Sequence, residues 1–166
     1  VDLIISENAF YIAKQELNLE LGNDKKNVKK NLLNFLKLNE KENILKIHFN
    51  NELWAGPSSG SYDSKLMLIC PSSMGTIAAI ASGLSQNLLQ RSADVMIKEN
   101  KPLIVVPRET PLSAIHLENM LKLAKSGVKI VPPLVGFYSK IDTLEDSINF
   151  VIGKILNACN IQNNLY

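Results

Sequence analysis

Short apolar runs alternate with helical patterns along this chain, and the alternation restricts the fold more than any other feature. The runs predicted as strands, each bounded by turn residues, lie at 2–6, 44–49, 66–70, 103–107 and 128–133. The helical patterns lie at 7–20, 74–84, 87–99, 111–126 and 142–158. Strands that alternate with helices form βαβ units. The sequence therefore predicts an α/β fold whose mostly parallel sheet is covered by helices on both faces.

The length of the chain predicts a single domain. It has 166 residues, of which 46% are hydrophobic, and this is enough to bury a sizeable core. We expect one domain over 1–166, with a C-terminal tail from about residue 160. The Lys/Asn-rich stretch at 23–43 is predicted to be a solvated helical insertion or connector.

Charge, cysteines and histidines narrow the class of protein. The net charge of +2 is too balanced to predict a nucleic-acid partner. Cys70 and Cys159 are far apart and belong to no CxxC or Cys/His cluster, so no disulfide framework and no metal site is predicted, and a reducing cytoplasm fits best. The sequence predicts neither a membrane span nor a signal peptide. His48 and His116 have no obvious carboxylate or serine partner and are predicted to be structural.

Polar side chains follow the predicted strands, at the edge where an open parallel sheet binds its ligands. The turns there read "SENA", "PSSMGT", "RET" and "PPLVGFY". In the second of them, Ser73 precedes a helix of small residues. Its hydroxyl and the N–H groups of the first turn could receive an anion or the polar edge of a planar ligand. The alternative is an ordinary serine-capped helix packed on the sheet.

Arg108 and Glu109 are charged residues that directly follow the buried run at 103–107. The guanidinium group of Arg108 suits a phosphate, and Glu109 could hold an arginine in place or move a proton. The alternative is an ion pair at the end of a strand. Thr110 is expected to cap the next helix. The face that this helix is predicted to bury consists of Leu117, Met120, Leu121 and Ala124.

Other cations and aromatic residues are ambiguous when each is taken alone. Arg91 and Lys98 are two turns apart on one predicted helix, where they would suit a phosphate or would simply be solvated. Trp54, in a Ser/Gly-rich connector, could pack on an aromatic ligand or anchor the loop. Tyr138 has a phenol side chain and Lys154 an amine. Each, taken alone, is predicted to be an ordinary core or surface residue.

Several motifs, taken in order, resemble the UbiX/Pad type of flavin prenyltransferases. They are "SSMGT", "GLSQNLLQRSADV", "IKENKPLIVVPRETPLSAIHLENMLKLAKSGVKIVPP" and "GFY". The resemblance covers about 54–160, and the opening "VDLIISENAFYIAKQEL" is similar to that family's second strand and following helix. The family's N-terminal strand and its Gly-Ala-Ser-Gly flavin-binding loop have no counterpart here. We therefore expect either an omitted segment or a shortened member of the family.

The resemblance implies a flavodoxin-like, Rossmann-like three-layer fold and a homododecamer with active sites at subunit contacts. It also implies an enzyme that uses FMN as a substrate, without a metal. A dimethylallyl group from dimethylallyl phosphate would be joined to N5 and C6 of reduced FMN, and the prenylated FMN would pass to a UbiD-type decarboxylase. Ubiquinone biosynthesis is the commonest setting of the family. The sequence does not choose between monophosphate and diphosphate donors.

The resemblance also implies roles for individual residues. Those expected to contact FMN are Ser6, Ser73, Met74, Gly75, Thr76 and Arg108. Those expected around the prenyl phosphate are Arg91, Lys98, Tyr138 and Lys154, with Trp54 as an aromatic wall. The residues expected to take part in the chemistry are Arg108, Glu109 and Glu16. Cations and a phenol near the departing phosphate would stabilise its charge as the carbon–oxygen bond breaks, while Glu109 relays a proton between phosphate and flavin.

Two other functions are compatible with the sequence. Flavin-dependent cysteine decarboxylases share the fold, but their Pro-x-Met-Asn-x-x-Met-Trp stretch has an asparagine that "PSSMGTIAA" lacks. A non-catalytic FMN-binding subunit is the other alternative, because the glycine-rich loop has no counterpart. It would bind FMN and yield no prenylated product.

Overall fold

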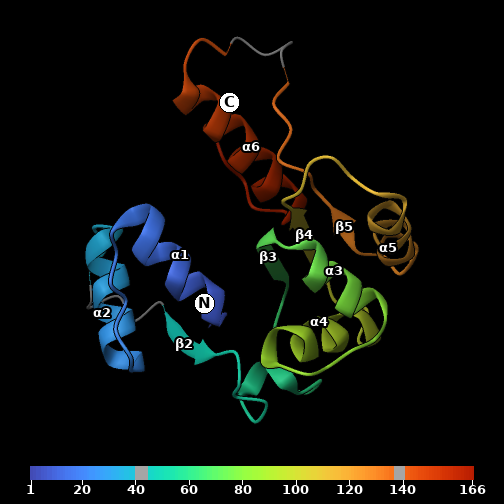
Figure 1. Cartoon of the computed structure of the whole chain (residues 1–166), viewed down its shortest axis with the longest axis horizontal. Helices are drawn as coiled ribbons and strands as arrows, with labels where there is room; N and C mark the ends of the chain where they lie inside the picture. The colour runs from blue at the N-terminus through green and yellow to red at the C-terminus, as the bar shows by residue number, and fades with distance from the viewer. Residues whose placement is uncertain (40–44, 137–140) are drawn as a thin grey trace. The chain divides into compact units, whose positions relative to one another are not determined.

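The computed structural model describes residues 1–39, 45–136 and 141–166, and its elements follow the predicted order (Figure 1). The chain divides into two compact units. The first unit comprises Val1–Tyr62 with Gln86–Ser92, and the second comprises Asp63–Ser85 with Ala93–Tyr166. Helix α4 (Leu88–Lys98) begins in the first unit and ends in the second.

In the first unit, β1 (Asp2–Ile5) pairs in parallel with β2 (Lys46–Phe49). Two helices, α1 (Glu7–Leu17) and α2 (Lys25–Phe35), belong to this unit. The core on which their apolar residues converge consists of Ile5, Ala13, Leu21, Val28 and Ile47.

Helix α2 confirms that the stretch at 23–43 contains a helix, but this helix is not solvated all round. Val28 is 0% exposed and Leu33 is 1% exposed, and α2 packs against β2. Apolar residues spaced along one face of a helix bury that face even when the rest is rich in lysine and asparagine. The stretch therefore contributes to the core.

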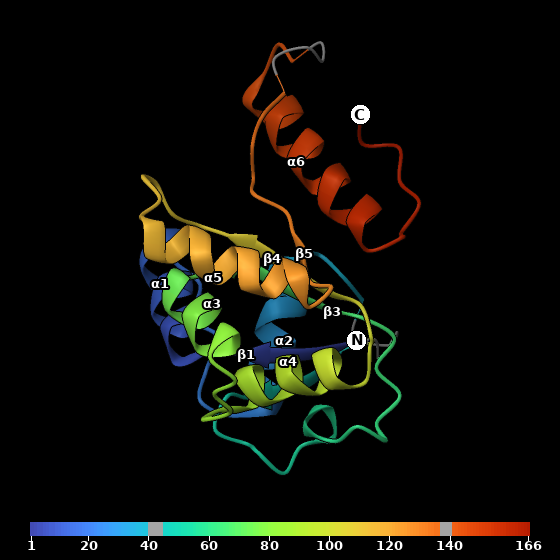
Figure 2. The ribbon, with the colours of Figure 1, turned by 90° about the vertical axis from the view of Figure 1, so that its right-hand side faces the viewer.

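In the second unit, β3 (Met67–Ser72), β4 (Leu103–Pro107) and β5 (Lys129–Ile130) form a parallel sheet in that order. All five residues of the central strand β4 are buried. Helix α3 (Met74–Ala81) packs beside α5 (Ala114–Lys125), as Figure 2 shows. Buried residues of β4 also meet the last helix, α6 (Leu144–Ala158), through Ile155.

The strand predictions are confirmed in type and direction, and their lengths differ. Every described strand pairs in parallel, but the pairing forms a two-stranded and a three-stranded sheet. The strand expected at 128–133 is reduced to Lys129–Ile130. Residues 40–44, which include the first residue of the strand expected at 44–49, lie outside the described residues.

The start and the buried face of α5 differ from the prediction. Ser113, not Thr110, caps the helix. The Ser113 Oγ accepts from the N–H of His116 at 3.2 Å, and His116 Nδ1 accepts from the N–H of Ser113 at 3.3 Å. A serine that forms this reciprocal pair supplies a better cap than a lone threonine upstream. Met120 is buried as expected, whereas Leu117 and Leu121 are 52% and 55% exposed. Ala124 is exposed as well.

The C-terminal tail folds back on α6. The ring of Tyr166 lies 5.0 Å from that of Phe150, centroid to centroid, and Asn157 Nδ2 donates to the Tyr166 hydroxyl at 2.7 Å. A tail from about residue 160 was predicted, but its packing on the last helix was not. Among the described helices, none has the length and apolar character that a membrane crossing requires.

Candidate functional site

Serines and an arginine occupy the carboxyl ends of neighbouring strands in the second unit. Ser73 follows β3 directly, and Arg108 follows β4. The N–H of Arg108 donates to the carbonyl of Ser72 at 3.0 Å, which ties the two strand ends together. The structure thus brings the predicted "SSMGT" and "RET" turns to one edge of one sheet.

Helix α3 starts at this edge with a side-chain cap. Ser73 Oγ accepts from the N–H of Thr76 at 3.2 Å and lies 3.1 Å from the Thr76 hydroxyl. The side chain of Met74 is buried in the second unit, so a ligand here would meet only its backbone. The remaining N–H groups of a first helical turn are the ones that can bind an anion.

Gly75 leaves open space in the first turn of α3. A Cβ atom placed on it would meet only Ser73 Oγ, at 3.8 Å, which is an ordinary contact. The packing of the described residues therefore does not require a glycine here. A close approach of a ligand to the backbone is one reason for a glycine at such a position.

Arg108 and Glu109 are both exposed, and they do not form the strand-end ion pair that was the alternative. Within the described part of the chain, Glu109 Oε1 accepts from the N–H of Thr110 at 3.1 Å. The guanidinium group of Arg108 has no acidic partner there. A planar cation that stands unpaired at the ligand edge of a sheet can bind a phosphate through two hydrogen bonds.

Arg91 and Lys98 both lie on α4, as predicted. Arg91 is partly buried. Lys98 is half exposed, and its Nζ lies 3.3 Å from Glu99 Oε1. Exposed pairs of this kind are weak, so Lys98 could exchange this partner for a phosphate.

Lys154 already has neighbours within the second unit. Its Nζ lies 4.8 Å from the ring centroid of Tyr166 and 5.2 Å from that of Phe150. Both distances are within the range of a cation–π contact. Tyr138 lies outside the described residues, so its expected contact with the prenyl phosphate stays a prediction.

Four predicted residues belong to the first unit: Ser6, Glu16, Trp54 and Arg91. Ser6 follows β1 and caps α1, because its Oγ accepts from the N–H of Ala9 at 3.3 Å. Glu16 is exposed near the other end of α1, and its ten-position separation from Ser6 corresponds to about 15 Å along a helix. The structure therefore does not bring Glu16 to Ser6.

The Ser/Gly-rich connector at 54–64 is anchored. The Tyr62 hydroxyl donates to Asp2 Oδ1 at 2.9 Å. The Tyr62 ring packs so closely over Gly56 that a Cβ atom there would collide with it. Residues Gly56–Ser58 form a short 3-10 helix, η2. Trp54 itself is 78% exposed, which leaves its indole available for a ligand.

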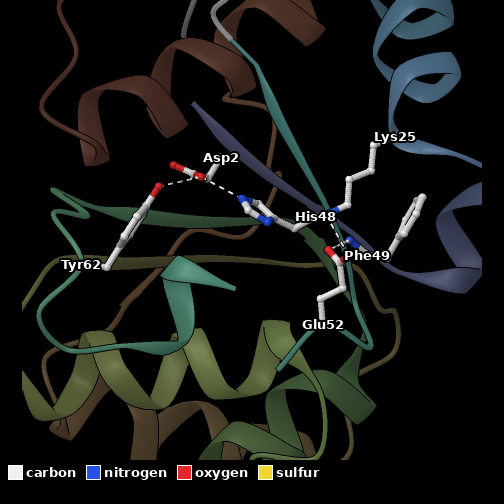
Figure 3. Close-up of polar contacts among 6 residues, drawn as sticks. All are labelled: Asp2, Lys25, His48, Phe49, Glu52 and Tyr62. Atoms are coloured by element: carbon white, nitrogen blue, oxygen red, sulfur yellow. Dashed lines mark hydrogen bonds and ion pairs between the residues drawn. The ribbon is translucent and has the colours of Figure 1, made fainter. Parts of the chain in front are cut away.

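Sequence reasoning missed a polar cluster in the first unit, shown in Figure 3. His48 Nε2 lies 2.8 Å from Asp2 Oδ1, on the neighbouring strand. Burial raises the pKa of Asp2, but the hydrogen bonds with His48 and Tyr62 outweigh it and hold the pKa below its usual value. The prediction that His48 lacks a carboxylate partner is wrong. The parallel pairing of two strands, each with a polar residue, was the signal that could have found it.

A surface pocket opens beside the carboxyl ends of β1 and β2. Its volume is about 270 Å³ and its lining residues are Ile5, Glu7, Phe10, Asn23, Phe49, Asn50 and Asn51. We assign no ligand to it, because Glu7, Asn23 and Asn51 are exposed to solvent. Over the described ranges, no cluster of three or more histidine, cysteine or acidic residues could hold a metal ion.

Comparisons with known proteins agree on one family. A sequence profile of the family described as Flavoprotein matches residues 1–156. The chain is 43% identical over 166 residues to the flavin prenyltransferase UbiX of Halalkalibacterium halodurans. The matched region covers all of this chain and 78% of that protein.

Two solved structures are similar over nearly the whole chain. One is AnUbiX (PadA1) in complex with FMN and dimethylallyl pyrophosphate. It has a TM-score of 0.80 and 36% sequence identity, and the superposed region covers 97% of this chain and 77% of that one. The other is a dodecameric FMN-dependent UbiX-like decarboxylase from Escherichia coli O157:H7. It has a TM-score of 0.79 and 33% sequence identity with this chain. The superposed region covers 98% of this chain and 79% of that one.

Proposed function

The chain belongs to the flavoprotein family and, within it, to the UbiX-type flavin prenyltransferases, and from this membership we propose that it transfers a dimethylallyl group from dimethylallyl phosphate to N5 and C6 of reduced FMN. The product is prenylated FMN. One observation in the structure carries the proposal. The open first turn of α3 and the unpaired guanidinium of Arg108 lie at the same sheet edge, in the described part of the second unit.

This edge has the groups that an FMN molecule needs. The first turn of α3 offers backbone N–H groups, and Gly75 leaves space for a planar ring to approach them. Thr76 and Ser73 supply hydroxyls. Ser6, at the start of α1, is proposed as a further contact. Bound in its reduced form, FMN supplies the two ring positions that accept the prenyl carbons.

The cations would act on the prenyl donor. Breaking its allylic carbon–oxygen bond leaves negative charge on the phosphate, and fixed positive groups stabilise that charge as it forms. We assign this task to Arg108, Arg91, Lys98 and Lys154, with Tyr138 as a hydroxyl donor. Trp54, largely exposed on an anchored connector, would face the delocalised allyl cation.

Glu109 would move the proton. Its carboxylate is exposed and holds only the N–H of Thr110 among the described contacts, so it can accept a proton from the flavin and donate it to the leaving phosphate. Glu16 is assigned a supporting acidic role. Because it stands at the far end of α1 from Ser6, it would reach an active site from a neighbouring subunit.

Such a contribution requires an oligomer, and a homododecamer is proposed. The exposed apolar side chains of α5 and α6 support association, because they would otherwise face water. These side chains are Leu117, Leu121, Leu144, Ile148 and Ile152. A UbiD-type decarboxylase is proposed to receive the product. Cys70 and Cys159 are both free thiols, which supports a reducing, cytoplasmic setting.

The experiment that tests the function is an anaerobic incubation of the protein with reduced FMN and dimethylallyl phosphate. Mass spectrometry should find a flavin heavier by one prenyl unit. Flavin that stays bound but unmodified, with the monophosphate and the diphosphate donor alike, would contradict the proposal. Protein loaded instead with oxidised FMN, which can accept the two electrons that oxidative decarboxylation releases, would then be incubated with a peptide that ends in cysteine. Loss of carbon dioxide from the peptide would identify a cysteine decarboxylase, and no reaction would identify a non-catalytic subunit.

A further inference from the structure

The first turn of α4 is capped from outside the helix by Asn50, the residue that follows β2. The carbonyl of Asn50 accepts from the N–H of Leu88 at 2.8 Å, and its Oδ1 accepts from the N–H of Leu89 at 2.9 Å. Asn87 Oδ1 then accepts from the N–H of Gln90 at 2.9 Å. All of these residues belong to the first unit.

These bonds occupy the groups through which a helix N-terminus usually binds an anion. The N–H groups of Leu88, Leu89 and Gln90 already have oxygen partners. The N-terminus of α4 therefore differs from that of α3, whose first turn remains open at Gly75. A phosphate near the start of α4 would have to be held by side chains, and Arg91 is the first cation of the helix.

Asn50 is itself fixed by the turn that it begins. Glu52 folds back, so that its Oε2 accepts from the N–H of Phe49 at 3.0 Å while its Oε1 lies 2.7 Å from Lys25 Nζ (Figure 3). The Glu52 side chain is only 12% exposed. A partly buried carboxylate with two partners holds a turn in one conformation. The strand end, the turn and the helix start thus form one connected set of contacts.

We infer that Asn50 is a positioning residue for the prenyl donor, because it fixes the first turn of α4 and thereby the place from which Arg91 reaches the donor phosphate. The inference rests on the proposed function. Asn50 itself is assigned no contact with the donor or the flavin. Its effect passes through Arg91, one residue beyond the capped turn.

The test measures binding of dimethylallyl phosphate to protein loaded with oxidised FMN, which cannot react, by titration calorimetry. Asn50→Ala removes the bond to Leu89 and should weaken donor binding by up to roughly fivefold, the factor reached when the whole free energy of a typical cap is coupled to donor binding. Asn50→Asp keeps an acceptor oxygen and should restore wild-type affinity. Asn51→Ala is the matched control, since its exposed side chain makes no described bond to α4. FMN affinity should be unchanged in all three variants.

A double-mutant cycle separates positioning from general stability. If Asn50 acts through Arg91, then Asn50→Ala should cause no further loss of donor affinity in protein that already carries Arg91→Ala. Additive losses in the double variant would overturn the inference. So would an Asn50→Ala protein that binds the donor as tightly as the wild type, or one that loses FMN and donor affinity together.

The two proposals fail in different ways. If the wild-type protein binds no dimethylallyl phosphate, the proposed function fails and the inference fails with it. If the wild type binds the donor and prenylates FMN while Asn50→Ala behaves identically, only the inference is overturned. Should Asn50→Ala not fold, Asn50→Asp decides the question, because a large loss of donor affinity with the cap retained contradicts positioning by the cap.

Discussion

Glu109 is the residue on which the proposed chemistry depends most directly. Its carboxylate is exposed at the end of β4, with the N–H of Thr110 as its described partner. A glutamine keeps the shape and the acceptor oxygen but cannot carry a proton between phosphate and flavin. We expect Glu109→Gln to slow prenylation by roughly 100-fold or more while FMN affinity stays the same.

Single-turnover mass spectrometry of the flavin measures this effect. Glu118→Gln is a suitable control, because Glu118 is an exposed glutamate on α5 outside the proposed site. A Glu109→Gln enzyme that prenylates FMN at the wild-type rate would remove Glu109 from the mechanism and leave Arg108 as the only active residue of the turn.

Asp2 should make the stability of the protein depend on pH. Its pKa is lowered on folding, because the hydrogen bonds with His48 and Tyr62 outweigh the effect of burial. A lowered pKa stabilises the native state fully above the unfolded value of about 3.9. That stabilisation is lost as the pH falls through the lower native value.

Thermal unfolding between about pH 3 and pH 7 tests this sign. The melting temperature of the wild type should exceed that of Asp2→Asn at neutral pH, and the gap should narrow as the pH falls. Asp142→Asn, at an exposed position, should follow the wild-type curve. A gap that stays constant with pH would mean that Asp2 contributes no titrating stabilisation.

Sequence could identify most of the candidate residues by type and position, but not their partners. Arg108 and Glu109 were predicted from a charged pair after an apolar run, and the structure places them at the expected edge. Asp2 and His48 were not linked, because 46 positions separate them and only the strand pairing brings them together. Asn50 was missed for the same reason. A local pattern carries no information about contacts of this kind.

At the scale of elements, the start of α3 allows flavin binding to be separated from folding. A Cβ atom on Gly75 meets nothing closer than 3.8 Å, and alanine favours a helix over glycine by about 1 kcal/mol. Gly75→Ala should therefore keep or slightly raise the melting temperature. The same methyl group would occupy the space of the flavin and should weaken FMN binding by roughly tenfold or more.

Fluorescence titration of FMN and thermal unfolding of the same sample measure the two effects together. If Gly75→Ala bound FMN with wild-type affinity, the open space at the start of α3 would not be the flavin site. A fall in both quantities would instead show that Gly75 serves the packing of the helix.

The positions of the helices were predicted more accurately than the residues at which they begin. The periodic pattern located α5, but the choice between Thr110 and Ser113 as its cap depended on whether His116 completes a reciprocal pair. The buried face was also misjudged. Leu117 and Leu121 fit the helical spacing, but that spacing does not tell whether an apolar face meets the core of the same chain or another molecule.

At the scale of the whole molecule, these exposed leucines predict an effect on assembly. Leu121 is 55% exposed on α5, and a charge buried in a subunit contact costs several kcal/mol unless it is paired. We expect Leu121→Glu to reduce the oligomer to smaller species with little loss of subunit stability.

Sedimentation velocity measures the assembly state, and Lys122→Glu, at an exposed neighbouring position, tests whether charge alone has the same effect. If Leu121→Glu sediments like the wild type, α5 does not contribute to the subunit contact, and Ile148 on α6 becomes the next position to test.

The overall architecture was predictable because apolar residues repeat with a different period in strands and in helices, and segments of the two kinds alternate along the chain. The parallel direction of every described strand pair confirms it. The number of sheets was not predictable, since periodicity identifies strands but not which edges pair. A single domain over 1–166 stays a prediction, beside the two compact units into which the contacts divide.

Strand β4 has one further consequence. All five of its residues are buried, and it has paired neighbours on both sides. Backbone amides in such a strand reach deuterated solvent only when the surrounding fold opens as a whole. The exchange rate of its amides would therefore report the global opening of the second unit. A slower exchange on adding FMN would measure, as a free energy, how far the flavin stabilises that unit.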